Sequence, residues 1–302
     1  MTDSLDLAIC STCGTQFSVP TVSSCKICDD PRQYIPPTGQ SWTTLRALQT
    51  SKTYHNDFVP DTTHPDALIA IHTTPKLGIG QSAYLCRTPA GNILWDCITY
   101  LDDATVARIT ELGGIAAIVI SHPHYFSTHL EWAAAFDCPV YLSAEDDEWI
   151  VRRGPAQVLW DGHRLPLPLP LGQPGAETEP DFEAVKTGGH FPGSAVLWWK
   201  SRRMLLIADT IMVVPSGIYH VDRLPGTTSF SFMWSYPNMI PLPPDEVHGI
   251  WKAIRHTDFD ETRGAFKGQE THGESKRRVL ESAKIVVKAM GYLDHAIHLE
   301  EC

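Results

Sequence analysis

Two histidines one residue apart follow a run of apolar residues near the middle of the chain. His122 and His124 come directly after Ile-Val-Ile-Ser, a pattern typical of a buried strand that ends in a loop. In α/β proteins, such strand ends are where ligands and catalytic groups are placed. If the segment is extended, residues i and i+2 point the same way, and Pro123 between them restricts the backbone. Both imidazoles can then bind one cation, so the pair predicts half of a metal site.

A second pair of candidate ligands lies further along the chain. His190 follows Thr-Gly-Gly, where the glycines permit a sharp turn or a close approach of the backbone to a metal. Asp209 follows Leu-Leu-Ile-Ala, another strand-like run. Three imidazoles with a carboxylate or a water are typical of zinc, whereas two histidines and a carboxylate also hold non-haem iron. The residues therefore predict one catalytic metal, with zinc favoured and iron as the alternative.

The order of these motifs resembles that of the metallo-β-lactamase fold superfamily. The chain reads His-x-His, then Gly-Gly-His, then a strand that ends in Ala-Asp-Thr, and the resemblance covers residues 67–302. It implies an αββα sandwich whose metal ligands follow successive strands. It also implies that the pocket metal is bound by His122, His124, His190 and Asp209, with Asp209 among the catalytic residues.

The chain departs from the superfamily at two positions. Members usually read His-x-His-x-Asp-His, but Phe126 and Ser127 occupy the last two positions here. Those positions normally supply the second metal's ligands and the Asp that orients water. We therefore predict a single metal in the pocket.

Two residues near these motifs are candidates for supporting roles. His129 stands at the predicted start of a helix, and we assign it a catalytic role as the proton acceptor that replaces the missing Asp. The alternatives are a metal ligand or a solvated or supporting histidine on the first helical turn. Asp96 ends an earlier strand and resembles the carboxylate that fixes the tautomer of a ligand histidine in this superfamily. Its other interpretation is a turn residue.

Late histidines and aromatic residues complete the candidate site. Superfamily members often carry a ligand histidine near the C-terminus, but His256 and His272 both lack a matching context. Aromatic side chains suit a flat, apolar substrate beside a metal, although aromatics more often fill cores. The predicted pocket-lining residues are Tyr125, Phe126, Trp234 and Tyr236.

Four of the eight cysteines form two paired knuckles near the N-terminus. Cys10-x-x-Cys13 and Cys25-x-x-Cys28 are typical of a zinc site rather than of disulfides. Four thiolates close the coordination sphere, so this zinc is predicted to be structural and to hold together a segment too short to fold unaided. The segment resembles a zinc ribbon. It is expected to brace the main domain, and the alternative is docking of a protein partner.

The pattern of elements indicates an α/β fold. Strands are expected near 67–72, 82–87, 93–95, 115–120, 139–142, 182–187, 194–199 and 203–208. Helices are expected near 102–112, 129–136, 145–151 and 274–290, and the Pro-rich stretch 165–174 is expected to be a surface loop. We predict a ribbon-like segment at 1–31, an ordered linker at 32–66 anchored by Trp42, and the main domain at 67–302.

Composition limits the partners and the location. The chain has 302 residues, 43% of them hydrophobic, which is ample for a large core. A formal charge of −11 and a pI near 5.6 disfavour nucleic acid as a partner, because a phosphate backbone needs a basic surface. No apolar run is long enough to span a membrane, and the first residues do not resemble a signal peptide. We therefore expect no membrane partner and a cytoplasmic location.

The leading hypothesis is a hydrolase that opens an ester, lactone or lactam through metal-bound hydroxide. Closer resemblance to a subgroup with fungal lactamases implies a small aromatic cyclic carbamate or lactam, such as a benzoxazolinone, as substrate. One alternative is a mononuclear iron oxidoreductase like the thiol dioxygenases of the same fold. The other is a non-catalytic scaffold with a degenerate pocket.

Overall fold

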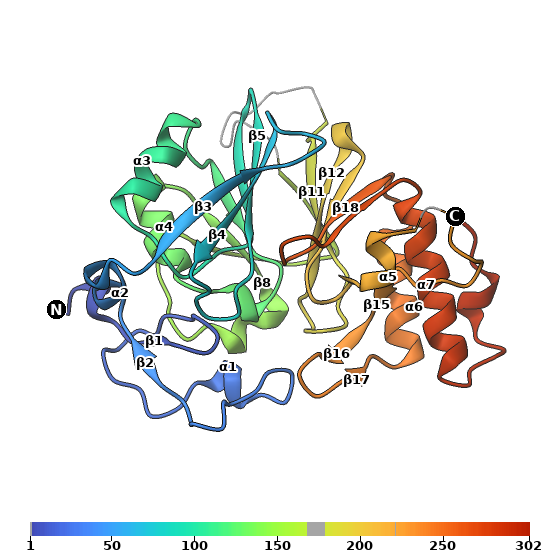
Figure 1. Ribbon diagram of the computed structural model, residues 1–302, viewed down its shortest axis with the longest axis horizontal. Helices are drawn as coiled ribbons and strands as arrows, with labels where there is room; N and C mark the ends of the chain where they lie inside the picture. Colours follow the sequence, from blue (N-terminus) through green and yellow to red (C-terminus); the bar gives the residue numbers. More distant parts are fainter. Residues whose placement is uncertain (1, 168–178, 221) are drawn as a thin grey trace. The chain divides into compact units, whose positions relative to one another are not determined.

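The computed structural model describes residues 2–167, 179–220 and 222–302, which form two compact units (Figure 1). The first unit comprises the described residues up to Trp160, and the second those from Asp161 onward. None of the helices in these ranges is long and apolar enough to cross a membrane. The predicted division into ribbon, linker and main domain stays a prediction.

The first unit is built on a seven-stranded sheet in the order β3-β4-β5-β6-β7-β8-β9. Pairing is antiparallel from β3 to β6 and parallel from β6 to β9. The strands are β3 (His55–Pro60), β4 (Leu68–Thr74), β5 (Ala83–Thr88), β6 (Gly91–Trp95), β7 (Ala117–Val119), β8 (Val140–Ser143) and β9 (Gln157–Trp160). Because parallel strands share a direction, β6 and β7 end at the same edge of the sheet, which receives Asp96 and His122.

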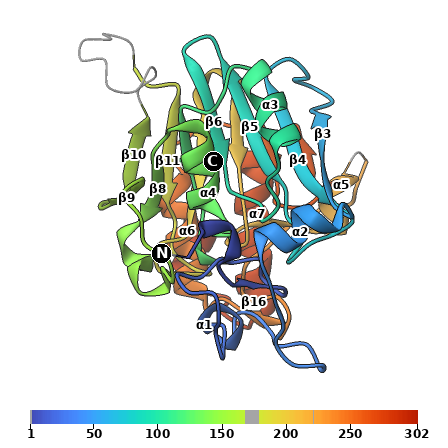
Figure 2. The ribbon, with the colours of Figure 1, turned by 90° about the vertical axis from the view of Figure 1, so that its left-hand side faces the viewer.

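Two helices connect the parallel strands and cover one face of this sheet (Figure 2). α3 (Asp103–Glu111) joins β6 to β7, and α4 (His129–Phe136) joins β7 to β8. Asp102 caps α3, because its Oδ1 accepts a hydrogen bond from the backbone N–H of Thr105 at 2.8 Å. Both helices and the strands they connect agree with the sequence analysis. The helix predicted near 145–151 is the 3-10 helix η3 (Ala144–Trp149).

The N-terminal ribbon contains little regular structure. Its elements are the 3-10 helix η1 (Ser4–Asp6), β1 (Ile9–Cys10) and α1 (Lys26–Asp29), and β1 pairs with β2 (Trp42–Thr43) of the linker. Trp42 packs edge-on against Phe17, with ring centroids 5.5 Å apart, so it fastens the linker to the ribbon. The linker is ordered, as expected, but it also supplies α2 (Leu45–Ser51) and β3. Neither was predicted.

The second unit contains a six-stranded sheet in the order β10-β11-β12-β13-β18-β19. Only β13 and β18 pair in parallel. The strands are β10 (Arg164–Leu167), β11 (Phe182–Lys186), β12 (Ala195–Trp199), β13 (Met204–Leu206), β18 (Glu261–Arg263) and β19 (Glu270–His272). The surface loop predicted at 165–174 is wrong at its start, because residues 165–167 pair with β11. Its remainder from 168 lies outside the described residues.

Between β13 and β18 the chain forms smaller elements. These are β14 (Met212–Val213), α5 (Pro215–Ile218), β15 (Phe230–Ser231), β16 (Met233–Ser235) and β17 (Ile240–Pro241). β14 pairs with β15, and β16 pairs with β17. The short 3-10 helices η4 (Lys200–Arg202) and η5 (Ala296–Leu299) complete the unit.

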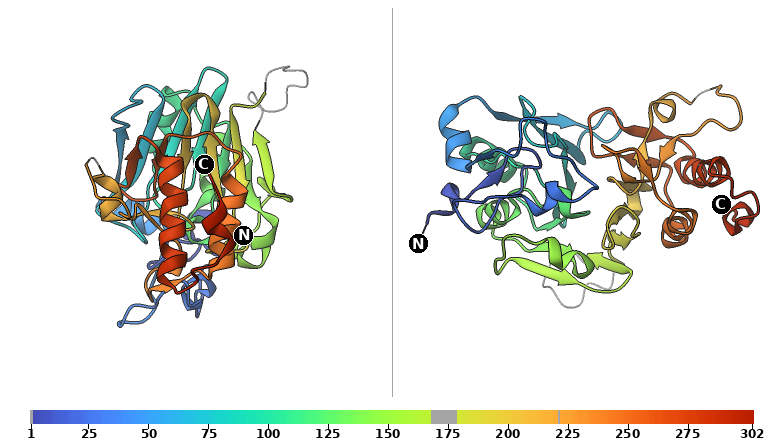
Figure 3. Two further views of the ribbon diagram at one scale, coloured as in Figure 1. Left: turned by 90° about the vertical axis from the view of Figure 1, so that its right-hand side faces the viewer. Right: turned by 90° about the horizontal axis from the view of Figure 1, so that it is seen from below.

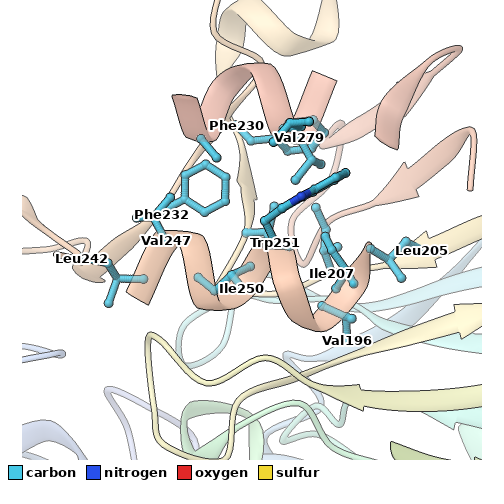
Figure 4. Packing of buried hydrophobic residues seen from close by; sticks show 14 of the residues in the cluster. Val196, Leu205, Ile207, Phe230, Phe232, Leu242, Val247, Ile250, Trp251 and Val279 are labelled. Atoms are coloured by element: carbon cyan, nitrogen blue, oxygen red, sulfur yellow. The ribbon is translucent and has the colours of Figure 1, made fainter. Parts of the chain in front are cut away.

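Two helices cover the six-stranded sheet (Figure 3). α7 (Ser275–Ala289) agrees with the sequence analysis, whereas α6 (Pro244–Ile254) was not predicted. Trp251 of α6 lies among apolar side chains of the sheet and of α7, including Ile207 and Val279 (Figure 4). Trp251 is 1% exposed, and removal of such a side chain costs about 3–5 kcal/mol. This core includes Val185 of β11 and Leu205 of β13, the strands that precede His190 and Asp209 in the chain.

Candidate metal centres

The loop after β7 is fixed at its first residue by a buried carboxylate. Asp96 directly follows β6, is 1% exposed and has a left-handed backbone with φ 60°. Its Oδ1 accepts a hydrogen bond from the backbone N–H of Ser121 at 2.7 Å. The Ser121 hydroxyl in turn lies 2.8 Å from Nδ1 of His122. Asp96 thus holds the residue that engages His122, which supports its predicted role beside the site.

The His-Pro-His segment is not extended. Residues Pro123–Tyr125 form the 3-10 helix η2, and His122 precedes it with extended backbone angles. The two histidines nevertheless converge, with ring centroids 5.1 Å apart and candidate ligand nitrogens within 4.8 Å of each other. The prediction of a shared direction is therefore confirmed, but its reason is a tight turn rather than strand geometry. With Nδ1 of His122 engaged by Ser121, Nε2 is the atom that would bind a metal.

Both aromatic residues after the histidines are buried. Tyr125 has no exposed surface, and its ring lies 4.5 Å from that of His122. Phe126 is 2% exposed and lies against the ring of His129 at 5.9 Å. The two rings therefore pack against histidines of this segment. Their predicted pocket-lining role stays a prediction.

In the second unit, two glycines place His190 directly after β11. Gly188 and Gly189 have positive φ values of 65° and 88°. A Cβ on Gly189 would lie 2.9 Å from Oγ1 of Thr210 and 3.0 Å from side chains of Leu242 and Ile250. Only glycine fits this packing without displacing its neighbours. The sequence indicated the turn, and the structure adds the close approach to α6.

His190 and Asp209 form a second donor pair. The ring of His190 is fully buried, and its Nδ1 lies 3.1 Å from the carbonyl oxygen of Met233. Nδ1 therefore donates its proton, and Nε2 carries the lone pair on the side of Asp209, whose Oδ2 is 3.7 Å away. The backbone of Asp209 is held by a hydrogen bond, which the Tyr236 hydroxyl donates to the Asp209 carbonyl oxygen at 2.9 Å.

Tyr236 and Trp234 differ in their surroundings. Burial raises the pKa of Tyr236 well above its ordinary value, so its hydroxyl keeps its proton and remains a donor. Trp234 is partly buried and packs against the hydrophobic core of the second unit. Both residues were predicted as pocket walls, and that role stays a prediction. The contact between Tyr236 and Asp209 was not predicted, because no local pattern signals a bond across 27 residues.

His129 is enclosed within the first unit. It is 5% exposed, its Nδ1 lies 2.7 Å from the carbonyl oxygen of Phe126, and Gln157 Nε2 lies 2.7 Å from its Nε2. Nδ1 donates and Nε2 accepts in this arrangement. Burial lowers the pKa of His129 to about 4, so the ring is neutral near pH 7. These contacts favour a structural histidine, and the catalytic role stays a prediction.

The late histidines contact carboxylates of the second unit. His256 Nε2 is 3.2 Å from Glu183, and His272 lies on β19 beside Glu261 and Glu270. Neither late histidine lies beside the end of β13. Arg263 occupies that place, and its carbonyl oxygen accepts a hydrogen bond from the N–H of Ile207 at 2.9 Å. Arg263 is fully buried and bonds Glu261 Oε2 at 2.7 Å. No sequence pattern marked Arg263 as a site residue, because arginine offers a metal no lone pair.

The four N-terminal cysteines form a compact thiol cluster. Cys10 and Cys28 have sulfurs 3.6 Å apart, as do Cys13 and Cys25, and all four residues are buried. Hydrogen bonds from Cys13 and the other two thiols lower the pKa of Cys10, whereas contact with Cys10 and burial raise the pKa of Cys13. Several thiolates cannot coexist there without a cation. The donors and their spacing therefore fit a zinc ion, as predicted.

The His and Asp donors also fit a divalent transition metal. Each pair presents oriented, buried donors, and three imidazoles with one carboxylate are typical zinc ligands. The same set also suits iron. The geometry supports metal binding by these donors.

Comparison with known proteins identifies the family. A model of the metallo-beta-lactamase superfamily matches residues 78–278, so the chain belongs to this superfamily. The predicted fold class is thereby confirmed. The chain is 39% identical over 290 residues to the uncharacterized protein YmaE of Bacillus subtilis strain 168, covering 93% of this chain and 96% of YmaE.

Two solved structures show the same fold at low sequence identity. VMB-1 has a TM-score of 0.53 at 10% identity, covering 78% of this chain and 98% of its own. The metallo-beta-lactamase FIM-1 from Pseudomonas aeruginosa, solved in its mono-zinc form, has a TM-score of 0.50 at 12% identity, covering 77% and 96%. The resemblance to fungal lactamases stays a prediction.

Proposed function

We propose that this protein is a hydrolase whose single pocket metal, zinc, is bound jointly by the two donor pairs. The ligands are His122, His124, His190 and Asp209. The observation that carries the proposal is that one histidine of each pair is oriented in advance, His122 through Ser121 and His190 through the carbonyl of Met233. Partners that fix ligand rings in this way are characteristic of functional metal sites.

The residues at the superfamily's second metal position support a single ion. The Phe126 ring carries no donor atom. The Ser127 hydroxyl lies 3.2 Å from the carbonyl oxygen of Cys97 and accepts from Nε2 of Gln81, also at 3.2 Å. Both of its roles in hydrogen bonding are therefore used inside the first unit. Neither position offers a ligand for a second metal.

These residues would hold a zinc ion, which when bound would supply an activated water near neutral pH and polarise a carbonyl group. The chain's own residues orient that chemistry. Asp96 fixes Ser121, Ser121 engages His122, and Tyr236 holds the backbone of Asp209. His129 keeps a neutral ring at the start of α4, behind Phe126. These residues keep the donors in place and supply no nucleophile of their own.

We propose an ester, lactone or lactam as the substrate class, and a small aromatic cyclic carbamate or lactam such as a benzoxazolinone as the first candidate. Superfamily membership supports the class. The resemblance to fungal lactamases supports the particular ring. Aromatic residues next to both donor pairs are compatible with a flat substrate.

The test is a hydrolysis assay of purified, metal-analysed protein on a benzoxazolinone, an aryl lactone and a β-lactam. Zinc-dependent ring opening of one of them supports the proposal, with His190→Ala as the inactive control. Absence of turnover in zinc-loaded protein contradicts it and favours the scaffold hypothesis. Iron in the pocket with oxygen uptake on a thiol substrate would instead support the dioxygenase alternative, since His122, His190 and Asp209 form a set that suits iron.

A further inference from the structure

The first cysteine knuckle of the ribbon lies directly against the loop that carries His122 and His124. The backbone N–H of Gln16 donates to the carbonyl oxygen of Ser127 at 3.1 Å. The Thr99 hydroxyl donates to the carbonyl oxygen of Gly14 at 3.1 Å. Both contacts lie within the first unit. The knuckle therefore touches the histidine loop at its far end, just before α4 begins.

The fit between knuckle and loop is close. Gly14 has a φ of 81°, and a Cβ on it would lie 1.9 Å from Oγ1 of Thr99. Thr99 also accepts the hydroxyl of Thr128 on its carbonyl oxygen at 2.8 Å. One buried threonine thus bonds the ribbon on one side and the end of the histidine loop on the other.

The loop needs this support because its last turn is strained. Ser127 has a left-handed backbone with φ 46°, a conformation that costs a residue other than glycine roughly 1 kcal/mol or more. Its carbonyl is held by Gln16 and its hydroxyl contacts Cys97 and Gln81. Ser127 lies three residues after His124, so a change in its conformation would reorient the turn that aims both imidazoles.

The shape of the knuckle depends in turn on the cysteines. The N–H of Gly14 donates to the carbonyl of Cys10 at 2.8 Å, and the N–H of Cys10 donates to the carbonyl of Thr15 at 3.0 Å. The sulfur of Cys13 lies 3.4 Å from the Thr15 hydroxyl. A metal that holds Cys10 and Cys13 therefore fixes the backbone that reaches Thr99 and Ser127.

A second connection runs through side chains. The Oε1 of Gln16 accepts from the guanidinium of Arg152, and Nη1 of Arg152 lies 2.6 Å from Oε1 of Glu131 on α4. Gln16 is 2% exposed, and the Arg152 and Glu131 side chains are largely buried. The ribbon is therefore linked to α4 as well as to the loop before it.

We propose that the first knuckle, residues 10–16, is a positioning element for the histidine loop, and that the ribbon metal thereby sets the affinity of His122 and His124 for the pocket metal. Thr99 and Gln16 are the positioning residues on which it acts. The inference rests on the proposed function only in requiring that the histidines bind a metal. It gives the ribbon a role in the site beyond bracing.

The test compares Thr99→Val, which removes the hydroxyl that bonds Gly14, with Thr99→Ser, which keeps it. Each protein, its ribbon filled with zinc, is titrated with Co²⁺, and the spectrum of cobalt in the histidine site gives the affinity. We expect Thr99→Val to bind pocket cobalt about 10-fold more weakly, within the 10–100-fold range typical of lost supporting contacts, and Thr99→Ser to restore it. Zinc in the ribbon should stay at one ion per chain in both.

The matched control is Thr105→Val. Thr105 is a buried threonine of the same unit whose hydroxyl bonds Asp102 at 2.6 Å, and its loss should lower stability without changing pocket affinity. If Thr99→Val does not fold, Gln16→Leu replaces it, because it removes the contact with Arg152 and keeps the side-chain size.

The outcomes separate this inference from the proposed function. Equal cobalt affinity in Thr99→Val and wild type would overturn the positioning role while leaving a metal-binding pocket. An equal loss in Thr99→Val and Thr105→Val would also overturn it, since the effect would follow general destabilisation. If wild-type protein with a filled ribbon binds no pocket cobalt, the proposed function fails and this inference fails with it.

Discussion

The thiol cluster and the His/Asp donors are built in opposite ways. Cys10 to Cys28 lie within one short segment with little regular structure, whereas the donors from His122 to Asp209 follow strands of two different units. We expect the ribbon to need its metal in order to fold, because so short a segment cannot bury enough apolar surface, whereas the donor loops follow strands of larger sheets. On this account one metal takes part in folding, and the other binds to a domain that has already folded.

Of the substitutions that test this comparison, Cys25→Ser is expected to have the largest effect on folding. Structural zinc contributes on the order of 10 kcal/mol to small zinc domains, so loss of one thiolate should sharply reduce the soluble yield and the thermal stability. The activity per folded molecule should fall less than the soluble yield does. Cys138→Ser is the control, because Cys138 is a buried thiol outside the cluster. A variant with normal yield and stability would show that the four cysteines are not a structural site.

His190→Ala should have the converse effect. It removes a ligand supplied by a turn, so we expect loss of the pocket metal and a fall in turnover of more than 10-fold, with an unchanged circular dichroism spectrum. His256→Ala, which removes a partly exposed histidine bonded to Glu183, should retain both. Retention of more than about a tenth of wild-type turnover in His190→Ala would exclude an essential ligand, because supporting contacts alone typically contribute 10–100-fold.

His129 makes a pH-dependent contribution to stability. Its pKa is lowered from 6.5 to about 4, so the unfolded chain binds the extra proton first as the pH falls. The stabilisation is complete above about pH 6.5 and is lost as the pH falls toward 4, with a total of about 3 kcal/mol. The free energy of unfolding, measured with urea between pH 7 and 4, should therefore fall more steeply with decreasing pH in wild type than in His129→Gln.

The same variant decides the catalytic role of His129. The contacts with Phe126 and Gln157 lead us to expect a fall in kcat of less than about 10-fold. A fall of roughly 10²–10⁴ with unchanged metal content would instead support proton transfer by this residue. Loss of metal as well would make it a ligand.

Tyr236→Phe should give the smallest effect. It removes one hydrogen bond to the backbone of Asp209, a loss of about 1 kcal/mol, and should weaken pocket metal binding several-fold. Tyr100→Phe is the control, because it removes a tyrosine hydroxyl that bonds Asp102, which is not a candidate ligand. Unchanged metal affinity in Tyr236→Phe would show that Asp209 is held by other contacts.

Much of both centres was visible in the sequence because their signals are local. A few consecutive residues are enough to recognise paired cysteines, a histidine pair after an apolar strand, or a glycine turn. β3 and the contacts of Gln16 and Thr99 were missed because they depend on partners distant in the chain. α6 was missed although Pro244 at its start and its apolar residues at helical spacing are local signals. The turn at Pro123 was misread for a related reason, since a short segment can aim two side chains alike in more than one conformation.

The central claim, one closed structural ion and one exchangeable pocket ion, is tested most directly by elemental analysis before and after mild chelation. We expect two metal ions per chain, of which chelation removes one and leaves the ribbon zinc with the fold intact. Three ions per chain would contradict the argument from Phe126 and Ser127 against a second pocket metal. A single ion that resists chelation would contradict metal binding by the His/Asp donors.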